Sequence, residues 1–122
     1  MADPIALVTG GSRGIGAATA RLAAERGYTV GINYRADRDA AEAVREEIER
    51  TGGRAICVRA DVADEADVLR MFDEVDASLG PLSALVNNAG IVATPSRLDA
   101  MTGERLHRMA AVNLVGSLLC AR

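Results

Sequence analysis

The stretch TGGSRGIG, from Thr9 to Gly16, contains four glycines between an apolar run and a helical pattern. Glycine loses more conformational freedom on folding than other residues and packs no side chain, so the bare backbone must serve a purpose here. The first N–H groups of a helix have no partner within the helix and bind anions. We therefore expect a phosphate group at this turn. Gly10 would permit the tight turn, Gly14 the approach of the phosphate, and Gly16 the packing of helix on strand. A flexible turn without a ligand is the alternative.

Two arginines lie where a second phosphate could bind. Arg13 is inside the glycine-rich turn. Asn33, Tyr34 and Arg35 follow about twenty residues later, where dinucleotide-binding domains contact the adenosine ribose. An acidic residue there would bind a free ribose 2′-hydroxyl, whereas two guanidinium groups suit a 2′-phosphate. Asp37 could oppose this preference by turning toward the ribose. The pattern favours NADP(H) as the cofactor, with NAD(H) as the alternative.

Apolar runs and helical patterns alternate along the chain. The apolar runs predict strands over residues 5–9, 29–34, 54–60 and 82–90. Capping residues and apolar spacing predict helices that begin at Ile15, Asp39, Asp64 and Thr102. The residues expected to face the sheet are Ile15, Ala18 and Leu22 in the first helix, Ala41, Val44 and Ile48 in the second, and Val68, Phe72, Val75 and Leu79 in the third. The last helix follows a loop that contains Pro95 and runs towards Arg122.

This regular alternation is typical of parallel strands joined by right-handed helical crossovers. It predicts an α/β fold, a Rossmann-type doubly wound parallel sheet with the strand order 3-2-1-4, in a single domain over residues 1–122. Ligands of such sheets bind beyond the carboxyl ends of the strands. The segments TGGSRGIG, NYR and NNAG all follow strands, so we expect them to form one site.

The amino-acid composition argues against some classes of binding partner. The chain is 49% hydrophobic and 25% charged with a net charge of −3, which argues against binding nucleic acid or an anionic membrane. No apolar run is long enough to span a membrane and no signal peptide is evident. We therefore expect a cytoplasmic protein in which Cys57 and Cys120 are reduced. No residue cluster indicates a metal site.

Four sequence features together resemble the short-chain dehydrogenase/reductase family. They are the spacing T-G-x-x-x-G-x-G at Thr9–Gly16, DV at Asp61 and Val62, NNAG at residues 87–90, and Asn113 in AVNLVGS. The resemblance implies that the glycines and the Ile15 amide line the cofactor pyrophosphate. Asp61 and Val62 would lie on either side of the adenine, and residues 87–90 would form the floor beneath ribose and nicotinamide. The candidate cofactor-binding residues are Thr9, Gly10, Ser12, Arg13, Gly14, Ile15, Gly16, Asn33, Tyr34, Arg35, Asp61, Val62, Asn87, Ala89 and Gly90. Asn113 matches the asparagine that holds a water in the family's proton relay, which makes it the candidate catalytic residue.

Structural roles remain open for several of these residues. Asp61 could belong to a helix start, and Arg35 could be a solvated loop residue. Asn87 and Asn88 could end a strand by bonding the local backbone. A buried Asn113 amide needs partners and could bond neighbouring backbone alongside the relay role.

The resemblance implies an NADP(H)-dependent oxidoreductase that interconverts an alcohol and a carbonyl of a small-molecule substrate by hydride transfer. The family's catalytic serine, tyrosine and lysine belong after the fifth strand, beyond these residues. All fourteen basic residues here are arginines, and neither Tyr28 nor Tyr34 has the right place in the sheet, so residues 1–122 alone are expected to be inactive. The alternative is a non-catalytic dinucleotide-binding or redox-sensing module.

The sequence of the last helix indicates contacts with parts of the protein beyond these residues or with another subunit. It is apolar nearly all round from Met109 to Leu119, which implies burial on several sides. In the family this helix also pairs subunits, so the resemblance implies a homodimer or homotetramer. With nothing beyond Arg122 the fourth strand would be an exposed edge, so we expect the domain to be incomplete at its carboxyl end. His107, the single histidine, is expected on the surface of this helix.

Overall fold

The computed structural model describes residues 3–91 and 97–122, so the predicted loop position of Pro95 lies outside the described residues. Four parallel strands form one sheet in the order β3-β2-β1-β4, which confirms the predicted order. The strands are β1 (Ile5–Val8), β2 (Thr29–Tyr34), β3 (Ala55–Arg59) and β4 (Ala84–Val86). β4 is much shorter than the predicted 82–90, because its polar continuation leaves the sheet.

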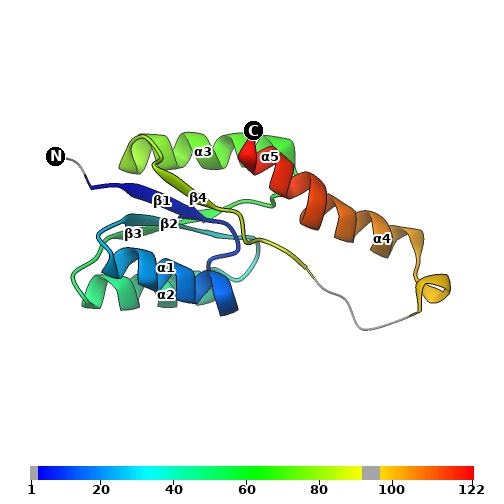
Figure 1. The fold of residues 1–122 in the computed structure, drawn as a ribbon, viewed down its shortest axis with the longest axis horizontal. Coiled ribbons are helices and arrows are strands. Elements are labelled where there is room, and N and C mark those ends of the chain that lie inside the picture. Colours follow the sequence, from blue (N-terminus) through cyan, green and yellow to red (C-terminus); the bar gives the residue numbers. More distant parts are fainter. Residues whose placement is uncertain (1–2, 92–96) are drawn as a thin grey trace.

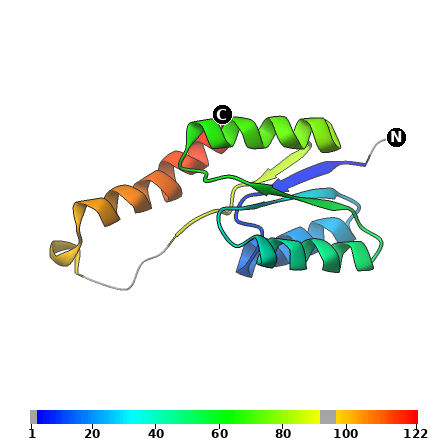
Figure 2. The same ribbon diagram turned by 180° about the vertical axis from the view of Figure 1, so that it is seen from behind.

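Helices cover both faces of the sheet (Figure 1). One face carries α1 (Gly14–Glu25) and α2 (Arg38–Arg50), and the other carries α3 (Glu65–Leu79) beside α5 (Ser117–Ala121). After a single 3₁₀ turn, η1 (Leu98–Ala100), the chain forms α4 (Gly103–Ala110), the π-helical segment η2 (Ala111–Gly116) and α5 without a break. Seen from behind in Figure 2, this last helix extends from beside α3 away from the sheet.

Side chains cap three of the four long helices at their starts. Asp64 accepts the Asp67 N–H at the start of α3, and Thr102 accepts the Arg105 N–H at the start of α4, as predicted. The predicted start of α2 at Asp39 is wrong, because Asp37 accepts the Ala40 N–H and begins the helix. Asp39 lies in the first turn, where its charge still favours the helix dipole.

The predicted inner face of α1 is also wrong. Ile15 is 79% exposed, Leu22 is 45% exposed and Ala18 is exposed, whereas the buried residues are Gly16, Ala17 and Ala20. Small residues let α1 lie close to the sheet, and this close approach places the larger apolar side chains outside. In α3 the predicted inner face is confirmed: Val68 and Val75 are buried, and the half-buried Phe72 and Leu79 pack against the same core. Met71 is buried there as well.

Two apolar cores lie on the two faces of the sheet. Consecutive residues of β1 serve opposite faces, because side chains alternate along a strand: Leu7 packs into the core beneath α3, and Val8 into the core beneath α1 and α2. The predicted face of α2, formed by Ala41, Val44 and Ile48, is buried in the second core. No helix in the described ranges is long and apolar enough to cross a membrane.

The last helix is only partly covered within one chain. Val112, Gly116 and Cys120 are buried against the domain. Large apolar side chains on its other sides stay in solvent, and these are Leu106, Leu114, Val115 and Leu118. The burial predicted on several sides is therefore not met by residues 3–91 and 97–122 themselves. His107 is exposed, as predicted.

Close contact at Gly116 docks the last helix on the segment after β3. A Cβ at Gly116 would lie 2.8 Å from Val62 Cγ2 and 2.9 Å from the Val62 carbonyl oxygen. We expect Gly116→Ala to lower the free energy of unfolding by about 1–3 kcal/mol, because the helix must move away from the Val62 backbone.

Gly103→Ala is the matched control, because a Cβ at Gly103 in the same helix meets nothing within 4 Å. It should leave stability unchanged or raise it by up to about 1 kcal/mol through helix propensity. Chemical denaturation of both full-length variants makes the comparison. Equal stability of the two would contradict close docking at Gly116.

Candidate dinucleotide site

Thr9 joins the end of β1 to the NNAG segment. Its side chain is buried, and its hydroxyl oxygen accepts the N–H groups of Asn88 and Ala89, both at 2.9 Å. In return, Asn88 Nδ2 donates to the carbonyl oxygens of Thr9 at 3.1 Å and Gly10 at 3.2 Å. The Thr9 side chain therefore positions the segments around the cleft, and its predicted contact with the cofactor stays a prediction.

Asn33 joins the glycine-rich turn to two strands. It is 2% exposed, and its Oδ1 accepts the Gly10 N–H at 3.0 Å. Its Nδ2 donates to the carbonyl oxygens of Val58 at 3.3 Å and Ala60 at 3.2 Å. The amide group predicted to face the cofactor is therefore engaged inside the protein. The neighbouring Tyr34, 8% exposed, packs into the core beneath α1 and α2 and is also a lining residue of the cleft.

The glycines of the turn differ in what surrounds them. A Cβ at Gly16 would lie 2.2 Å from the Gly10 carbonyl oxygen, so α1 can pack here only without a side chain. Gly14, with a φ of +52°, has nothing within 4 Å of the place where a Cβ would be. The packing role predicted for Gly16 is confirmed, and the turn keeps open space in front of Gly14.

A cleft of about 720 Å³ lies beyond the carboxyl ends of the strands. Its lining includes these predicted residues: Gly10, Ser12, Arg13, Gly14, Ile15, Asn33, Tyr34, Arg35, Asp61, Val62, Ala89 and Gly90. The structure thus brings the turn, the end of β2, the DV segment and part of NNAG together. Thr9, Gly16 and Asn87 do not line it. Asn87 Nδ2 instead donates to the Ser117 carbonyl oxygen at 2.7 Å and holds the end of β4 to the last helix.

The cleft also contains residues that are not among the candidate cofactor-binding residues. They are Ala36, Asp37, Ala60, Asn88, Ile91, Arg108 and Val112. Of these, Asn88 belongs to the NNAG segment that was expected to form the floor of the site. Arg108 lies in α4, 47 residues from its partner Asp61, and no local pattern indicates that pairing.

The start of α1 differs from the other helix starts. It has no capping side chain and no acidic residue in its first turn. By contrast, α2, α3 and α4 each have both. The free N–H groups and the helix dipole make the start of α1 electropositive, and Gly14 and Ile15 at this start line the cleft. These residues fit a pyrophosphate.

Charged groups gather at the end of the cleft near β2. Arg13 forms an ion pair with Asp37. Arg35 Nε lies 3.7 Å from Asp61 Oδ2, and the same oxygen accepts from Arg108 at 3.0 Å. Asp37 therefore pairs with Arg13 and caps α2, and it does not pair with Arg35.

Both carboxylates are held in the ionised form. The Ala40 N–H and then the Arg13 guanidinium lower the pKa of Asp37. Burial by itself would raise the pKa of Asp61, but the Ala63 N–H and Arg108 outweigh it, so that the pKa falls below its usual value. At neutral pH the cleft therefore carries two fixed negative charges opposite three arginines.

Asn113 forms a two-way hydrogen-bonded pair with Ile91. Its Nδ2 donates to the Ile91 carbonyl oxygen at 2.8 Å, and its Oδ1 accepts the Ile91 N–H at 2.7 Å. The expectation of a buried amide is wrong, because Asn113 is exposed in the π-helical segment. Its structural bond to backbone is present, and it holds the segment after NNAG to the last helix.

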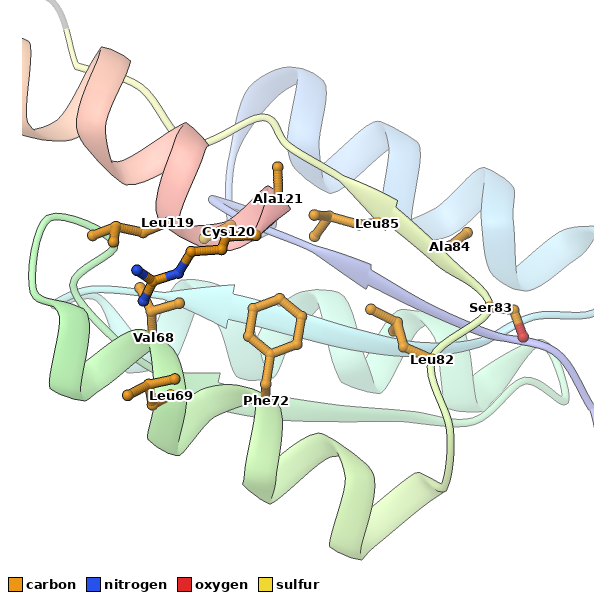
Figure 3. A pocket seen from close by; sticks show the side chains of 11 residues that line it. Val68, Leu69, Phe72, Leu82, Ser83, Ala84, Leu85, Leu119, Cys120 and Ala121 are labelled. Atoms are coloured by element: carbon orange, nitrogen blue, oxygen red, sulfur yellow. The ribbon is translucent and has the colours of Figure 1, made fainter.

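A second cavity of about 580 Å³ lies between α3, β4 and α5. Figure 3 shows Phe72 and Val68 of α3 on one side of this cavity, Leu82 and Leu85 on another, and Leu119 of α5 above Val68. Its lining is mainly apolar, and its polar or ionisable side chains are those of Ser83, Cys120 and Arg122. Among the residues that the structure describes, no group of three His, Cys, Asp or Glu side chains could hold a metal ion. Cys57 and Cys120 are free thiols, and burial raises the pKa of Cys57 to about 11.

Comparison with known proteins decides the family. The family model for short chain dehydrogenases matches residues 4–122. The chain belongs to this family.

Two relatives and one solved structure illustrate the similarity. An uncharacterized oxidoreductase of Escherichia coli, YgfF, is 49% identical over 97% of this chain and 48% of its own length. The 3-oxoacyl-[acyl-carrier-protein] reductase FabG of Staphylococcus aureus is 50% identical over 94% of this chain and 46% of its own length. A short chain dehydrogenase from Burkholderia cenocepacia, solved in complex with NADP, superposes with a TM-score of 0.91 at 42% identity, covering 97% of this chain and 48% of that one. The chain thus spans about half the length of the relatives it matches.

The Thr9 hydroxyl generates a prediction for this member of the family. Thr9→Val keeps the shape of the side chain but removes the acceptor that the Asn88 and Ala89 N–H groups share. The Asn88 N–H keeps the Val86 carbonyl oxygen at 3.0 Å, whereas the Ala89 N–H loses the acceptor it has in Thr9. We expect the free energy of unfolding to fall by about 1–3 kcal/mol. Thr9→Ser keeps the hydroxyl and loses only a methyl group, at a cost of about 1 kcal/mol. Urea denaturation of both variants tests this, and equal losses would contradict the role of the hydroxyl.

Proposed function

We propose that the protein is an NADP(H)-dependent oxidoreductase that interconverts an alcohol and a carbonyl by hydride transfer, and that this chain is its cofactor-binding half. The observation that carries the proposal is the cleft in which the uncapped start of α1 and the two arginines Arg13 and Arg35 lie together. One feature suits a pyrophosphate, and the other suits a 2′-phosphate.

Each part of the cofactor has residues that fit it. The N–H groups at Gly14 and Ile15 would bind the pyrophosphate, and Arg13 and Arg35 would bind the 2′-phosphate. The adenine would lie at Asp61 and Val62. The ribose and nicotinamide would lie over Asn88, Ala89 and Gly90.

The bound cofactor supplies the hydride chemistry, and this chain's residues bind and orient it. The proton must come from elsewhere, because proton transfer needs a group within hydrogen-bond reach of the substrate oxygen. Tyr28 precedes β2, at the end of the strand away from the cleft, and Tyr34 is buried. We assign the proton donor to residues beyond 122. Asn113, through its pair with Ile91, would position the end of the NNAG segment and hold the relay water.

The proposal includes the substrate class, the assembly and the location. The substrate is a small carbonyl compound or alcohol. The name of the reductase from Staphylococcus aureus supports the carbonyl, although its 3-oxoacyl group is carried on a protein. The exposed Leu114, Val115 and Leu118 of the last helix favour a homodimer or homotetramer. The net charge of −3 favours neither nucleic-acid nor membrane partners, and we propose a cytoplasmic location.

A second candidate is a non-catalytic dinucleotide-binding or redox-sensing module, which would use the same cleft. NADPH oxidation by the full-length protein over a panel of carbonyl compounds distinguishes the two. Turnover supports the oxidoreductase, and tight NADPH binding without turnover supports the module.

Arg13 and Arg35 allow a prediction about the cofactor preference. The double variant Arg13→Ala and Arg35→Ala should weaken NADPH binding about 10- to 300-fold, because two charge-assisted hydrogen bonds are lost. NADH, which has no 2′-phosphate, should bind as before. Arg21→Ala is the control, since Arg21 pairs with Glu47 and does not line the cleft. An equal loss for both cofactors, measured by isothermal titration calorimetry, would show that the arginines support the loop and do not bind the phosphate.

Gly14 allows a prediction about the affinity for both cofactors. Gly14→Ala should weaken both NADPH and NADH, because its Cβ enters the open space in front of the turn. The positive φ adds about 1–2 kcal/mol of strain to the folded state. Binding is therefore measured well below the melting temperature of the variant. Unchanged affinity for both cofactors in the folded variant would contradict a pyrophosphate at this turn.

A further inference from the structure

The two arginines proposed to bind the 2′-phosphate are held very differently. Arg13 forms a close ion pair with Asp37. Arg35 lies 3.7 Å from Asp61, which already accepts from Arg108 at 3.0 Å and from the Ala63 N–H at 3.0 Å. Arg35 is therefore loosely held, whereas Arg13 already has a close anionic partner.

The position of the Asp37 carboxylate does not depend on Arg13. One oxygen, Oδ1, accepts the Ala40 N–H at 3.0 Å and caps α2. The other, Oδ2, faces Arg13, and the residue lines the cleft. The helix start keeps the carboxylate in place when Arg13 moves, because a cap and a helix dipole both favour a negative charge there.

We propose that Asp37 is a specificity-determining residue: a fixed internal anion that competes with the 2′-phosphate of the cofactor for Arg13. The inference rests on the proposed NADP(H) function. When the phosphate binds, Arg13 passes from the carboxylate to the phosphate, and Asp37 remains beside a second anion. Asp37 thereby limits how strongly the site prefers a 2′-phosphate over a 2′-hydroxyl.

Electrostatics gives the size of the effect. One unit charge next to a phosphate dianion at a solvent-exposed site, screened by salt, changes affinity by about 3- to 10-fold. The effect is confined to ligands that carry the 2′-phosphate. It decreases as ionic strength rises, because Arg13 and Asp37 are both substantially exposed.

The test is Asp37→Asn in the full-length protein. Asparagine caps helices about as well as aspartate, so the substitution removes the charge and keeps the acceptor for Ala40. The probes are adenosine 2′,5′-bisphosphate and adenosine 5′-monophosphate, which differ only by the 2′-phosphate. Calorimetric titration at low salt should show about 3- to 10-fold tighter binding of the bisphosphate to the variant and unchanged binding of the monophosphate.

Asp64→Asn is the matched control. It removes the same charge and keeps the cap at the start of α3, but Asp64 does not line the cleft. Its affinity for both probes should equal that of the wild type. An equal gain in bisphosphate affinity would assign the effect to net charge and overturn the inference.

Two further results overturn it. One is an unchanged ratio of the two affinities in Asp37→Asn. The other is weaker binding of the monophosphate, which would show that Asp37 binds the ribose 2′-hydroxyl. The wild type tests the proposed function separately. If it binds the bisphosphate no more tightly than the monophosphate, NADP(H) specificity is contradicted. A higher ratio in Asp37→Asn than in the wild type supports the competition even in that case.

Discussion

Thr9 Oγ1 accepts the N–H groups of Asn88 and Ala89, and Asn33 Oδ1 accepts the N–H group of Gly10. Both side chains are buried, and the bonds that they accept are partly buried, so the loss of either acceptor would weaken the connection between these segments. The ends of β1, β2 and β4 are thereby fixed relative to one another. Every other feature of the cleft depends on this, because its walls come from segments far apart in the sequence. The side chains of Thr9 and Asn33 hold in place, from inside the protein, the backbone that a ligand would contact.

The charge distribution of the cleft depends on which helix starts carry acidic residues and which do not. α2, α3 and α4 each have a capping side chain and an acidic first turn, and α1 has neither. The start of α1 is therefore the one of these four whose N–H groups and dipole remain available to an external anion. Arg13 and Arg35 extend this positive region, and Asp37 and Asp61 limit it. The two carboxylates therefore weaken the attraction of this region for anions, whereas a uniformly basic surface would attract any anion strongly.

Much of the architecture could be predicted from the sequence. β2 matches its predicted range, Thr29–Tyr34, and the strand order is as expected, because alternating strands and helices leave few topologies. The face of α1 could not be predicted, since nearly every residue there is small or apolar and the spacing does not identify a side. The exposed setting of Asn113 was missed because a polar residue among apolar ones suggested burial. Arg108 was missed because its pairing with Asp61 depends on where the last helix docks, and no local pattern contains that information.

The uncapped start of α1 also couples folding to the surroundings of the protein. A missing cap makes a helix less stable by about 1 kcal/mol, and an anion that binds only the folded chain offsets that loss. The added stability grows with the logarithm of ligand concentration, by about 2.7 kcal/mol when the ligand is at a hundred times its dissociation constant. The fraction of folded protein would then rise with the supply of that anion. A domain whose first helix has no capping side chain is thus most stable where an anion that binds the free N–H groups is abundant.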